Sequence, residues 1–176
     1  MIYLISDTHF DHENIIRYCK RPFKSVQEMN ETIVKNWNSI VGSEDIVYHL
    51  GDFSLGKKVD AIGIAKRLKG IKYLIRGNHD KWSTKAYEEM GFNVLDDSLV
   101  RLDEYKLLLS HVPAQDIEVP EGYINVHGHI HNNNLYECIE NYDPKLYSLE
   151  KHLNISCDMT DFRPISVIEV EQKNIY

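Results

Sequence analysis

Short apolar runs recur along the chain and predict buried strands, because each is too short for a buried helix and is rich in Ile, Val or Leu. We predict these strands at residues 2–5, 46–50, 71–75, 107–109, 123–126 and 153–156. At residues 165–170 apolar and polar side chains alternate, as they do in a strand with one face in water. This pattern predicts a last strand near the C-terminal end.

Helical patterns separate the early strands. Ser25 followed by Glu28 has the form of a capping box, and apolar residues then recur at three- and four-residue steps as far as residue 40. Further helices are predicted at residues 59–69, ended by Gly70, and from Ser83 or Thr84 to Gly91. Alternating strands and helices are typical of an α/β fold. We therefore expect a sheet-based α/β domain whose C-terminal half is mostly β.

Length and composition fit one domain over residues 1–176. The chain is 43% hydrophobic and 27% charged, which is ordinary for a soluble globular protein. Its formal net charge of −7 argues against a general nucleic-acid binder, which would carry a basic face. The charge does not exclude a phosphate substrate, because bound cations would reverse the local field.

The cysteines and the start of the chain indicate a cytoplasmic protein. Cys19, Cys138 and Cys157 are few, odd in number and widely spaced, which argues against a disulfide framework. The first residues are apolar over only five positions and follow no basic segment, so we interpret them as a strand and not as a signal peptide. No apolar run approaches the ~20 residues that a membrane span needs.

Polar, metal-capable side chains follow five of the apolar runs. The groups are Asp7-Thr8-His9, Gly51-Asp52, Gly77-Asn78-His79-Asp80, His111 and the stretch from His127 to His131. Ligands of open α/β sheets gather outside the carboxyl ends of the strands. If these strands share a sheet edge, the five groups converge there.

The donor atoms in these groups suggest two metal ions. The candidate ligands are Asp7, His9, Asp52, Asn78, His111, His129 and His131. Carboxylate, imidazole and amide donors without cysteine suit Mn, Fe, Co, Ni or Zn, whereas structural zinc sites more often use cysteines. Seven ligands are too many for one tetrahedral ion. They suit two ions that share a bridging carboxylate, as in two-metal hydrolytic sites.

The order and context of these groups resemble the signature of the calcineurin-like metallophosphoesterases. The matching blocks are Asp7-x-His9, Gly51-Asp52, Gly77-Asn78-His79-Asp80, His111 and Gly128-His129-x-His131. They span about three quarters of the chain and show no departure from the metal-ligand pattern. No single block is specific, but five in the same order are hard to obtain by chance.

The resemblance implies a fold and a role for each residue. The fold would be a four-layer αββα sandwich of two mixed sheets flanked by helices. Asp7, His9 and His131 would hold one ion and Asn78, His111 and His129 the other, with Asp52 bridging both. A hydroxide bridging the ions would attack phosphorus, and Mn is our first expectation for both ions, with Fe, Ni, Co or Zn as alternatives. His79 would contact phosphate or protonate the leaving group, and Asp80 would steer the His79 ring.

Several functions remain open at this point. A phosphodiesterase acting on small molecules or nucleotides is our first expectation, and a phosphomonoesterase or protein phosphatase is the alternative. A nuclease comes third because of the acidic charge. A catalytically silent, protein-binding scaffold would have lost a ligand or His79, and neither is lost. Residues 113–122 and 132–150 are the long connections expected to set substrate choice. The oligomeric state stays open.

Other polar residues receive weaker assignments. His12 is either a substrate contact or a helix-entry residue, and Arg17 and Arg76 are candidate phosphate contacts, although Arg76 would also fit a packing role along the sheet. We expect a hydrogen-bonded place beneath the site for His127, a core or sheet-face position for His49 and a surface or loop position for His152. Solvated turn positions are expected for Asp158 and Asp161, with a supporting place behind the metal ligands as the alternative.

Overall fold

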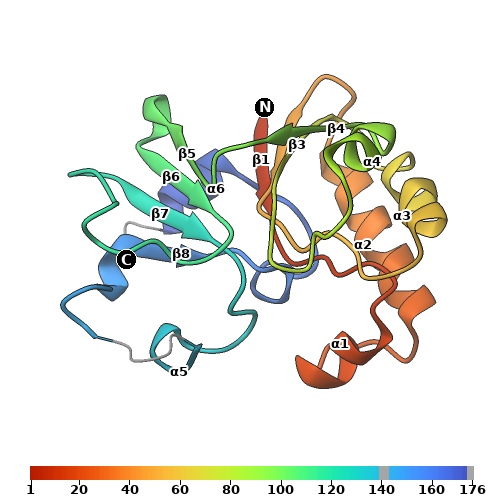
Figure 1. The fold of residues 1–176 in the computed structure, drawn as a ribbon, viewed down its shortest axis with the longest axis horizontal. Helices are drawn as coiled ribbons and strands as arrows, with labels where there is room; N and C mark the ends of the chain where they lie inside the picture. The colour runs from red at the N-terminus through yellow and green to blue at the C-terminus, as the bar shows by residue number, and fades with distance from the viewer. Residues whose placement is uncertain (139–142, 174–176) are drawn as a thin grey trace.

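Two sheets lie face to face in the computed structural model, which describes residues 1–138 and 143–173 (Figure 1). The first sheet has the strand order β4-β3-β2-β1-β9 and the second has the order β5-β6-β7-β8. In the first sheet β1 to β4 run parallel and β9 antiparallel, and in the second β5 alone is antiparallel to its neighbour. Both sheets are therefore mixed, as expected.

The strands are short. The first sheet contains β1 (Ile2–Ile5), β2 (Ile46–His49), β3 (Ile71–Ile75), β4 (Phe92–Leu95) and β9 (Ile165–Ser166). The second contains β5 (Leu99–Leu102), β6 (Leu107–Ser110), β7 (Ile124–His127) and β8 (His152–Asn154). The predicted strands are confirmed except the last, and β4 and β5 are additional.

The helices are α1 (Glu13–Tyr18), α2 (Val26–Ile40), α3 (Lys58–Ala65), α4 (Thr84–Glu89), α5 (Leu135–Cys138) and α6 (Val167–Lys173), with 3₁₀ turns at Asp103–Tyr105, Leu149–Lys151 and Cys157–Met159. In Figure 1, α2, α3 and α4 lie on the side of the first sheet away from the second sheet, whereas α6 lies on the side of β1 that faces the second sheet. The Ser25 hydroxyl accepts the backbone N–H of Glu28 at 3.2 Å, which confirms the predicted cap of α2. None of the helices in the described ranges is long and apolar enough to cross a membrane.

Consecutive residues of β1 enter two different cores. Ile5 packs against α2 residues such as Ile33 and Trp37, whereas Leu4 packs between the sheets with Leu109 and other residues of the second sheet. Side chains alternate across a strand, so a strand buried on both faces must be apolar throughout. A smaller cluster around Leu108 covers the outer face of the second sheet beneath residues 113–122.

The predicted strand at residues 165–170 is wrong. Only Ile165–Ser166 is a strand, and α6 follows at once. The Ser166 hydroxyl accepts the Glu169 N–H at 3.1 Å, and the Glu169 carboxylate accepts the Ser166 N–H at 2.8 Å. These reciprocal bonds form a capping box, a signal that outweighs the period-2 pattern because it fixes the first helical turn. Val167 and Val170, three residues apart, are then both buried.

Candidate metal centre

The carboxyl ends of β1, β2, β3, β6 and β7 bring the predicted ligands together. Backbone hydrogen bonds tie the loops to one another, with Asp7 N–H donating to Gly51 O and His9 N–H donating to Asp52 O, each at 3.0 Å. The loops after β6 and β7 are joined by Gly128 N–H donating to His111 O at 3.0 Å. The expected convergence of the five groups is therefore observed, although they come from two sheets.

The backbone at this edge is strained. Positive φ angles occur at Asp7 (56°), His9 (49°), Asp52 (57°), His129 (71°) and His131 (51°). Residues with a Cβ rarely adopt this left-handed region, and such strain clusters at functional sites because the surrounding structure holds it. Five of the seven predicted ligands have such a φ angle. The strain lowers the stability of the fold, and the same backbone conformation orients these side chains.

Two glycines are required here by close approach. A Cβ at Gly77 would clash with the Asp52 carboxylate, and one at Gly128 would clash with the Asp7 carboxylate and the Ser6 hydroxyl. Both glycines thus let a neighbouring loop lie directly against a buried carboxylate.

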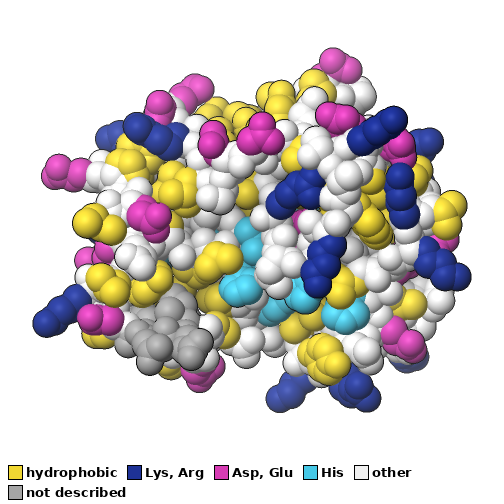
Figure 2. Space-filling model, viewed as in Figure 1, with side chains coloured by type: hydrophobic (Ala, Val, Ile, Leu, Met, Phe, Trp, Pro, Cys, Tyr) yellow, Lys and Arg dark blue, Asp and Glu magenta, His cyan; other side chains and the backbone are white. Residues whose placement is uncertain are grey.

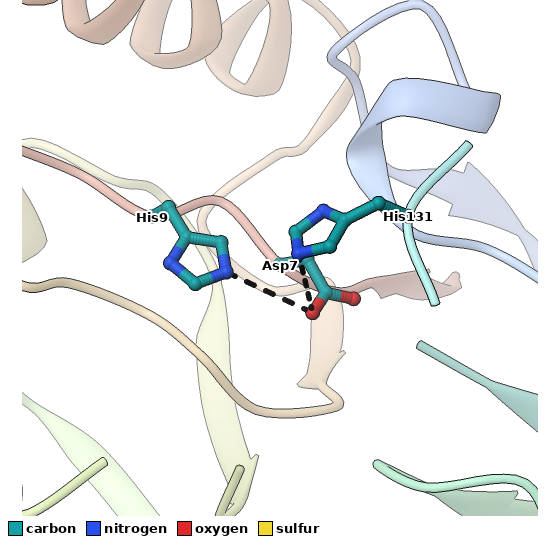
Figure 3. A group of neighbouring side chains, drawn as sticks. All are labelled: Asp7, His9 and His131. Carbon is teal, nitrogen blue, oxygen red and sulfur yellow. Dashed lines mark ion pairs between the residues drawn. The ribbon is translucent and has the colours of Figure 1, made fainter. Parts of the chain in front are cut away.

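The first group of ligands contains Asp7, His9 and His131, whose side chains turn toward one another (Figure 3). The Nε2 atoms of both histidines lie 4.0 Å from Asp7 Oδ1, which is too long for a hydrogen bond. Asp7 Oδ1 and His9 Nε2 are buried and have no hydrogen-bond partner among the described residues. Buried polar atoms are normally paired, so these two unpaired atoms fit the coordination of a cation.

The second group contains Asn78, His111 and His129. Asn78 Oδ1 lies 2.9 Å from both His111 Nε2 and His129 Nδ1, and these two nitrogens are 3.2 Å apart. Asp52 lies between the groups, with Oδ2 at 3.5 Å from both His9 Nε2 and His111 Nε2. All seven predicted ligands are thus brought together in two groups that share one carboxylate.

Burial shifts the pKa values of the ligand side chains. It lowers the pKa of His9 well below its ordinary value, with the neighbouring His131 and Arg21 adding to the effect. Burial raises the pKa of Asp52 and so favours its protonated form, although His111 opposes this shift. A neutral imidazole is the form that binds metal. A bound cation would also offset the cost of burying the carboxylates.

A buried ion pair between Arg21 and Asp158 supports the first group of ligands through the Nδ1 atom of His131. Asp158 Oδ2 lies 2.9 Å from His131 Nδ1, and Arg21 donates to both Asp158 oxygens at 2.8 and 2.9 Å. Arg21 also donates to the backbone oxygens of Asp7 and Thr8. Burial alone would lower the pKa of His131, but the hydrogen bond with Asp158 helps to raise it to about 10, so a bound cation would have to displace a proton from this ring.

The expectation that Asp158 is a solvated turn residue is wrong. Its side chain is buried, and its carboxylate fixes the His131 ring so that Nε2 points toward Asp7. The sequence carries no local signal for this contact, because Asp158 lies 27 residues from His131. Arg21 was also not predicted, and Asp161 is exposed as expected.

His79 and Asp80 have different surroundings. His79 is exposed at the edge of the centre, its ring centroid 5.6 Å from that of His9, and its backbone N–H donates to Asp52 Oδ1 at 2.8 Å. The Asp80 carboxylate is buried and accepts the N–H groups of Asp52, Phe53 and Gly77. It also accepts the Tyr87 hydroxyl at 3.0 Å. These contacts join the loops after β2 and β3, and none of them reaches the His79 ring.

The weaker substrate candidates divide into two cases. His12 lies at the centre, with its ring centroid 5.3 Å from that of His9 and its buried Nδ1 unpartnered among the described residues. Arg17 instead hydrogen-bonds Asn14 on α1, in a separate hollow. Arg76 donates to Trp82 O at 2.6 Å and to Thr84 Oγ1 at 2.8 Å, so its guanidinium group braces the chain before α4.

Three further histidines occupy structural positions. His127 is buried outside both ligand groups, with Nδ1 2.9 Å from Gly128 O. His49 is buried and contacts Thr8 Oγ1 at 2.9 Å, as expected for a satisfied core residue. His152 is not a surface residue, because β8 places its ring nitrogens 3.2 Å from Asn125 and Asp116 oxygens.

The centre opens into a hollow in which histidine side chains gather (Figure 2). One cavity, of about 350 Å³, is lined by His9, His12, Tyr18, His79 and His131 among others. A second cavity, of about 430 Å³, is lined by His111, Leu99, Val112 and neighbouring residues. Asn78 lines both cavities, so both adjoin the same centre.

The chain belongs to the calcineurin-like phosphoesterase family, whose family model matches residues 1–164. It is therefore placed among hydrolases of phosphate esters, and the metal-capable groups agree with a metal-dependent family. The chain is 41% identical to Uncharacterized protein MJ1445 of Methanocaldococcus jannaschii, over 94% of this chain and 86% of that protein. It is 29% identical to the Gene 66 protein of Mycobacterium phage L5, over 72% of this chain and 75% of that protein.

A solved structure shares the fold over almost the whole length. The protein of unknown function AQ665 from Aquifex aeolicus superposes with a TM-score of 0.70 at 29% sequence identity. The match covers 98% of each chain. The two-sheet architecture is therefore shared with this solved structure over nearly the whole of both chains.

Proposed function

We propose that this protein is a phosphodiesterase that uses two divalent metal ions to hydrolyse small-molecule or nucleotide diesters. The observation that carries the proposal is the pair of ligand groups sharing Asp52, with Oδ2 at 3.5 Å from a histidine of each group. Sharing one carboxylate between two ligand sets is the arrangement that two-metal hydrolytic sites need.

The donor set fits two ions. Asp7, His9 and His131 would hold the first, Asn78, His111 and His129 the second, and Asp52 both. When bound, such ions supply positive charge against the phosphoryl oxygens and lower the pKa of a coordinated water. Mn is our first expectation, and the oxygen and nitrogen donors also suit Fe, Co, Ni or Zn.

The protein's own groups position and protonate the substrate. His79 lines the first cavity and is exposed, so its ring can approach the oxygen of a leaving group and donate a proton to it. Its backbone is held by Asp52, which couples the position of the acid to that of the bridging carboxylate. Asp80 would act on His79 by fixing these two loops.

Two features support small diesters over the other substrates. The centre has a cavity on each side, which offers room for two ester groups. The net charge of −7 disfavours long polyanions such as nucleic acids. We also propose the cytoplasm as the location, on the few and scattered cysteines.

The test is an assay of the Mn-loaded protein on bis-p-nitrophenyl phosphate and on p-nitrophenyl phosphate, with metal content measured in the same sample. We expect a higher kcat/KM for the diester. A higher value for the monoester would favour the phosphomonoesterase alternative. Absence of hydrolysis of both compounds with two ions bound would overturn the enzyme proposal and favour a binding scaffold.

A further inference from the structure

We propose that the cavity beside Asn78 and His111 binds the ester group that stays on phosphorus, and that this group is uncharged and nucleoside-like. The inference rests on the proposed diesterase function and specifies its substrate class. The cavity, of about 430 Å³, is within the range of small-molecule sites. It adjoins the second ligand group directly, since Asn78 and His111 form part of its lining.

The position of His79 assigns the two cavities to different ends of the substrate. His79 lines the cavity on the His9 side but not the one on the His111 side. In hydrolysis, water oxygen forms a bond to phosphorus and the bond to the leaving oxygen breaks, while an acid gives that oxygen its proton. The leaving group therefore needs a cavity that His79 lines, and the cavity beside His111 is not one of these. The ester bond on the other side stays intact, and its group remains beside His111.

The lining of the second cavity selects against further negative charge. Arg76 is the one lysine or arginine of this lining, whose residues all lie in the described ranges, and two of its guanidinium nitrogens already donate to Trp82 O and Thr84 Oγ1. Glu118, also in the lining, adds a carboxylate. A retained group carrying another phosphate would be repelled by the Glu118 carboxylate and would have to compete with Trp82 and Thr84 for the Arg76 donors.

The same lining favours a ring with hydroxyl or amino groups. Leu99, Val112 and Pro113 offer an apolar wall, while Ser98 and Glu118 offer polar atoms. Val112 is 50% exposed, so apolar surface is available to a ligand at this point. A flat apolar ring against this wall and hydroxyl or amino groups toward Glu118 together describe a nucleoside better than an alkyl chain or a sugar phosphate.

The test uses substrates that share one leaving group, p-nitrophenol, and differ in the retained group. They are p-nitrophenyl phosphate, its methyl ester, the thymidine 5′-ester and the same thymidine ester with a 3′-phosphate. We expect kcat/KM to rise about tenfold or more from the methyl ester to the thymidine ester, the change that one additional set of favourable contacts with the cavity would give. The added 3′-phosphate should reverse most of the gain.

Two variants locate the effect. Ser98→Trp places a bulky ring in the cavity and should remove the preference for thymidine over methyl, leaving hydrolysis of the monoester within about twofold. Ser43→Trp, an exposed turn position at the opposite end of β2, is the matched control and should keep the preference. Glu118→Gln keeps an acceptor but removes the charge, and it should restore hydrolysis of the 3′-phosphate substrate.

The outcomes separate the two proposals. No hydrolysis of any substrate by the metal-loaded protein would overturn the proposed function itself. Hydrolysis at equal kcat/KM for methyl and thymidine esters, or a preference that survives Ser98→Trp, would overturn only the assignment of this cavity. A 3′-phosphate that improves the wild-type reaction would overturn the uncharged class and point to polynucleotide ends.

Discussion

The two ligand groups, which form the first and second halves of the proposed metal centre, differ in how their side chains are supported. The first half holds His131 through buried Asp158 and Arg21, and Arg21 also binds the backbone of the Asp7 loop. In the second half, His111 Nδ1 lies 2.8 Å from Leu50 O, so this ring is held by a backbone oxygen and not by a buried ion pair. Asn78 is exposed. We infer that the first half is rigid and already arranged for metal binding. The second half is the one that the substrate can reach from the second cavity.

Ligand fixation by a buried carboxylate raises the affinity for metal, because the ring needs no reorganisation on binding. Exposure of a ligand instead leaves room for exchange with water or substrate. We therefore expect the ion of the first half to bind more tightly than the ion of the second. Substitutions in and around the two halves test this contrast and the roles of the residues beside them.

Asp52→Asn should have the largest effect, because Asp52 is shared by both halves. Loss of the bridging charge is expected to lower the affinity for both ions and to reduce kcat by several orders of magnitude. Metal content after dialysis and turnover of bis-p-nitrophenyl phosphate measure the two effects. Asp60→Asn, on the exposed start of α3, is the control. Two retained ions and full turnover would show that Asp52 does not bridge.

His79→Asn should leave both halves loaded and lower the rate by about 10²–10⁴, the usual contribution of a general acid. The loss should be greatest for leaving groups poorer than p-nitrophenol, because these need the proton most. Metal content and kcat for a series of aryl esters provide the measurement. Equal losses across the series would contradict the role of His79 as the acid.

Asp158→Asn should weaken only the first half. The substitution keeps the size of the side chain but removes the charge that holds His131 and Arg21, so affinity for the first ion should fall about 10–100-fold. Calorimetric titration of the metal-free protein would resolve two binding events and show which one changes. Asp161→Asn, exposed in the same segment, is the matched control. Equal weakening of both events would remove the proposed contrast between the halves.

Stability toward acid should depend on His49, which ties the end of β2 to Thr8 in the first half. Burial lowers the pKa of His49 to about 4. Between about pH 6.5 and pH 4 the unfolded chain binds a proton at this residue and the folded chain does not. Stability is thus lost as the pH falls through this window, with a slope approaching about 1.4 kcal/mol per pH unit. Denaturant unfolding of wild type and His49→Gln at several pH values should show a smaller slope in the variant.

His127→Gln should have the smallest effect on metal. The ring lies outside both ligand groups and contacts the Gly128 carbonyl, so the metal content should not change even if stability falls. Metal analysis by mass spectrometry is the direct check. Loss of an ion from either half would place His127 among the ligands and reverse the preference for His129 and His131.

Some features of the fold were predictable because their signals are local. The early strands and the cap of α2 follow from runs and spacings of a few residues, and Ser25 and Glu28 behave as the sequence indicates. The Ser166–Glu169 capping box was equally local, and the alternating pattern of residues 165–170 concealed it. The positive φ angles of Asp7, His9 and Asp52 had no such signal, because Asp and His adopt the left-handed region more often than other residues with a Cβ but do not require it.

The sequence by itself determined which side chains would meet. Each predicted ligand lies one to four residues after an apolar strand, and the strand order brings these strand ends to the same edge of the molecule. Tertiary structure decided what supports and surrounds them. Arg21 and Asp158 are 137 residues apart, and Asp80 joins two loops by accepting backbone N–H groups. Such contacts depend on the packing of distant segments, which no local pattern of residues encodes. The two cavities beside Asn78 arise in the same way, from where the chain segments leave space.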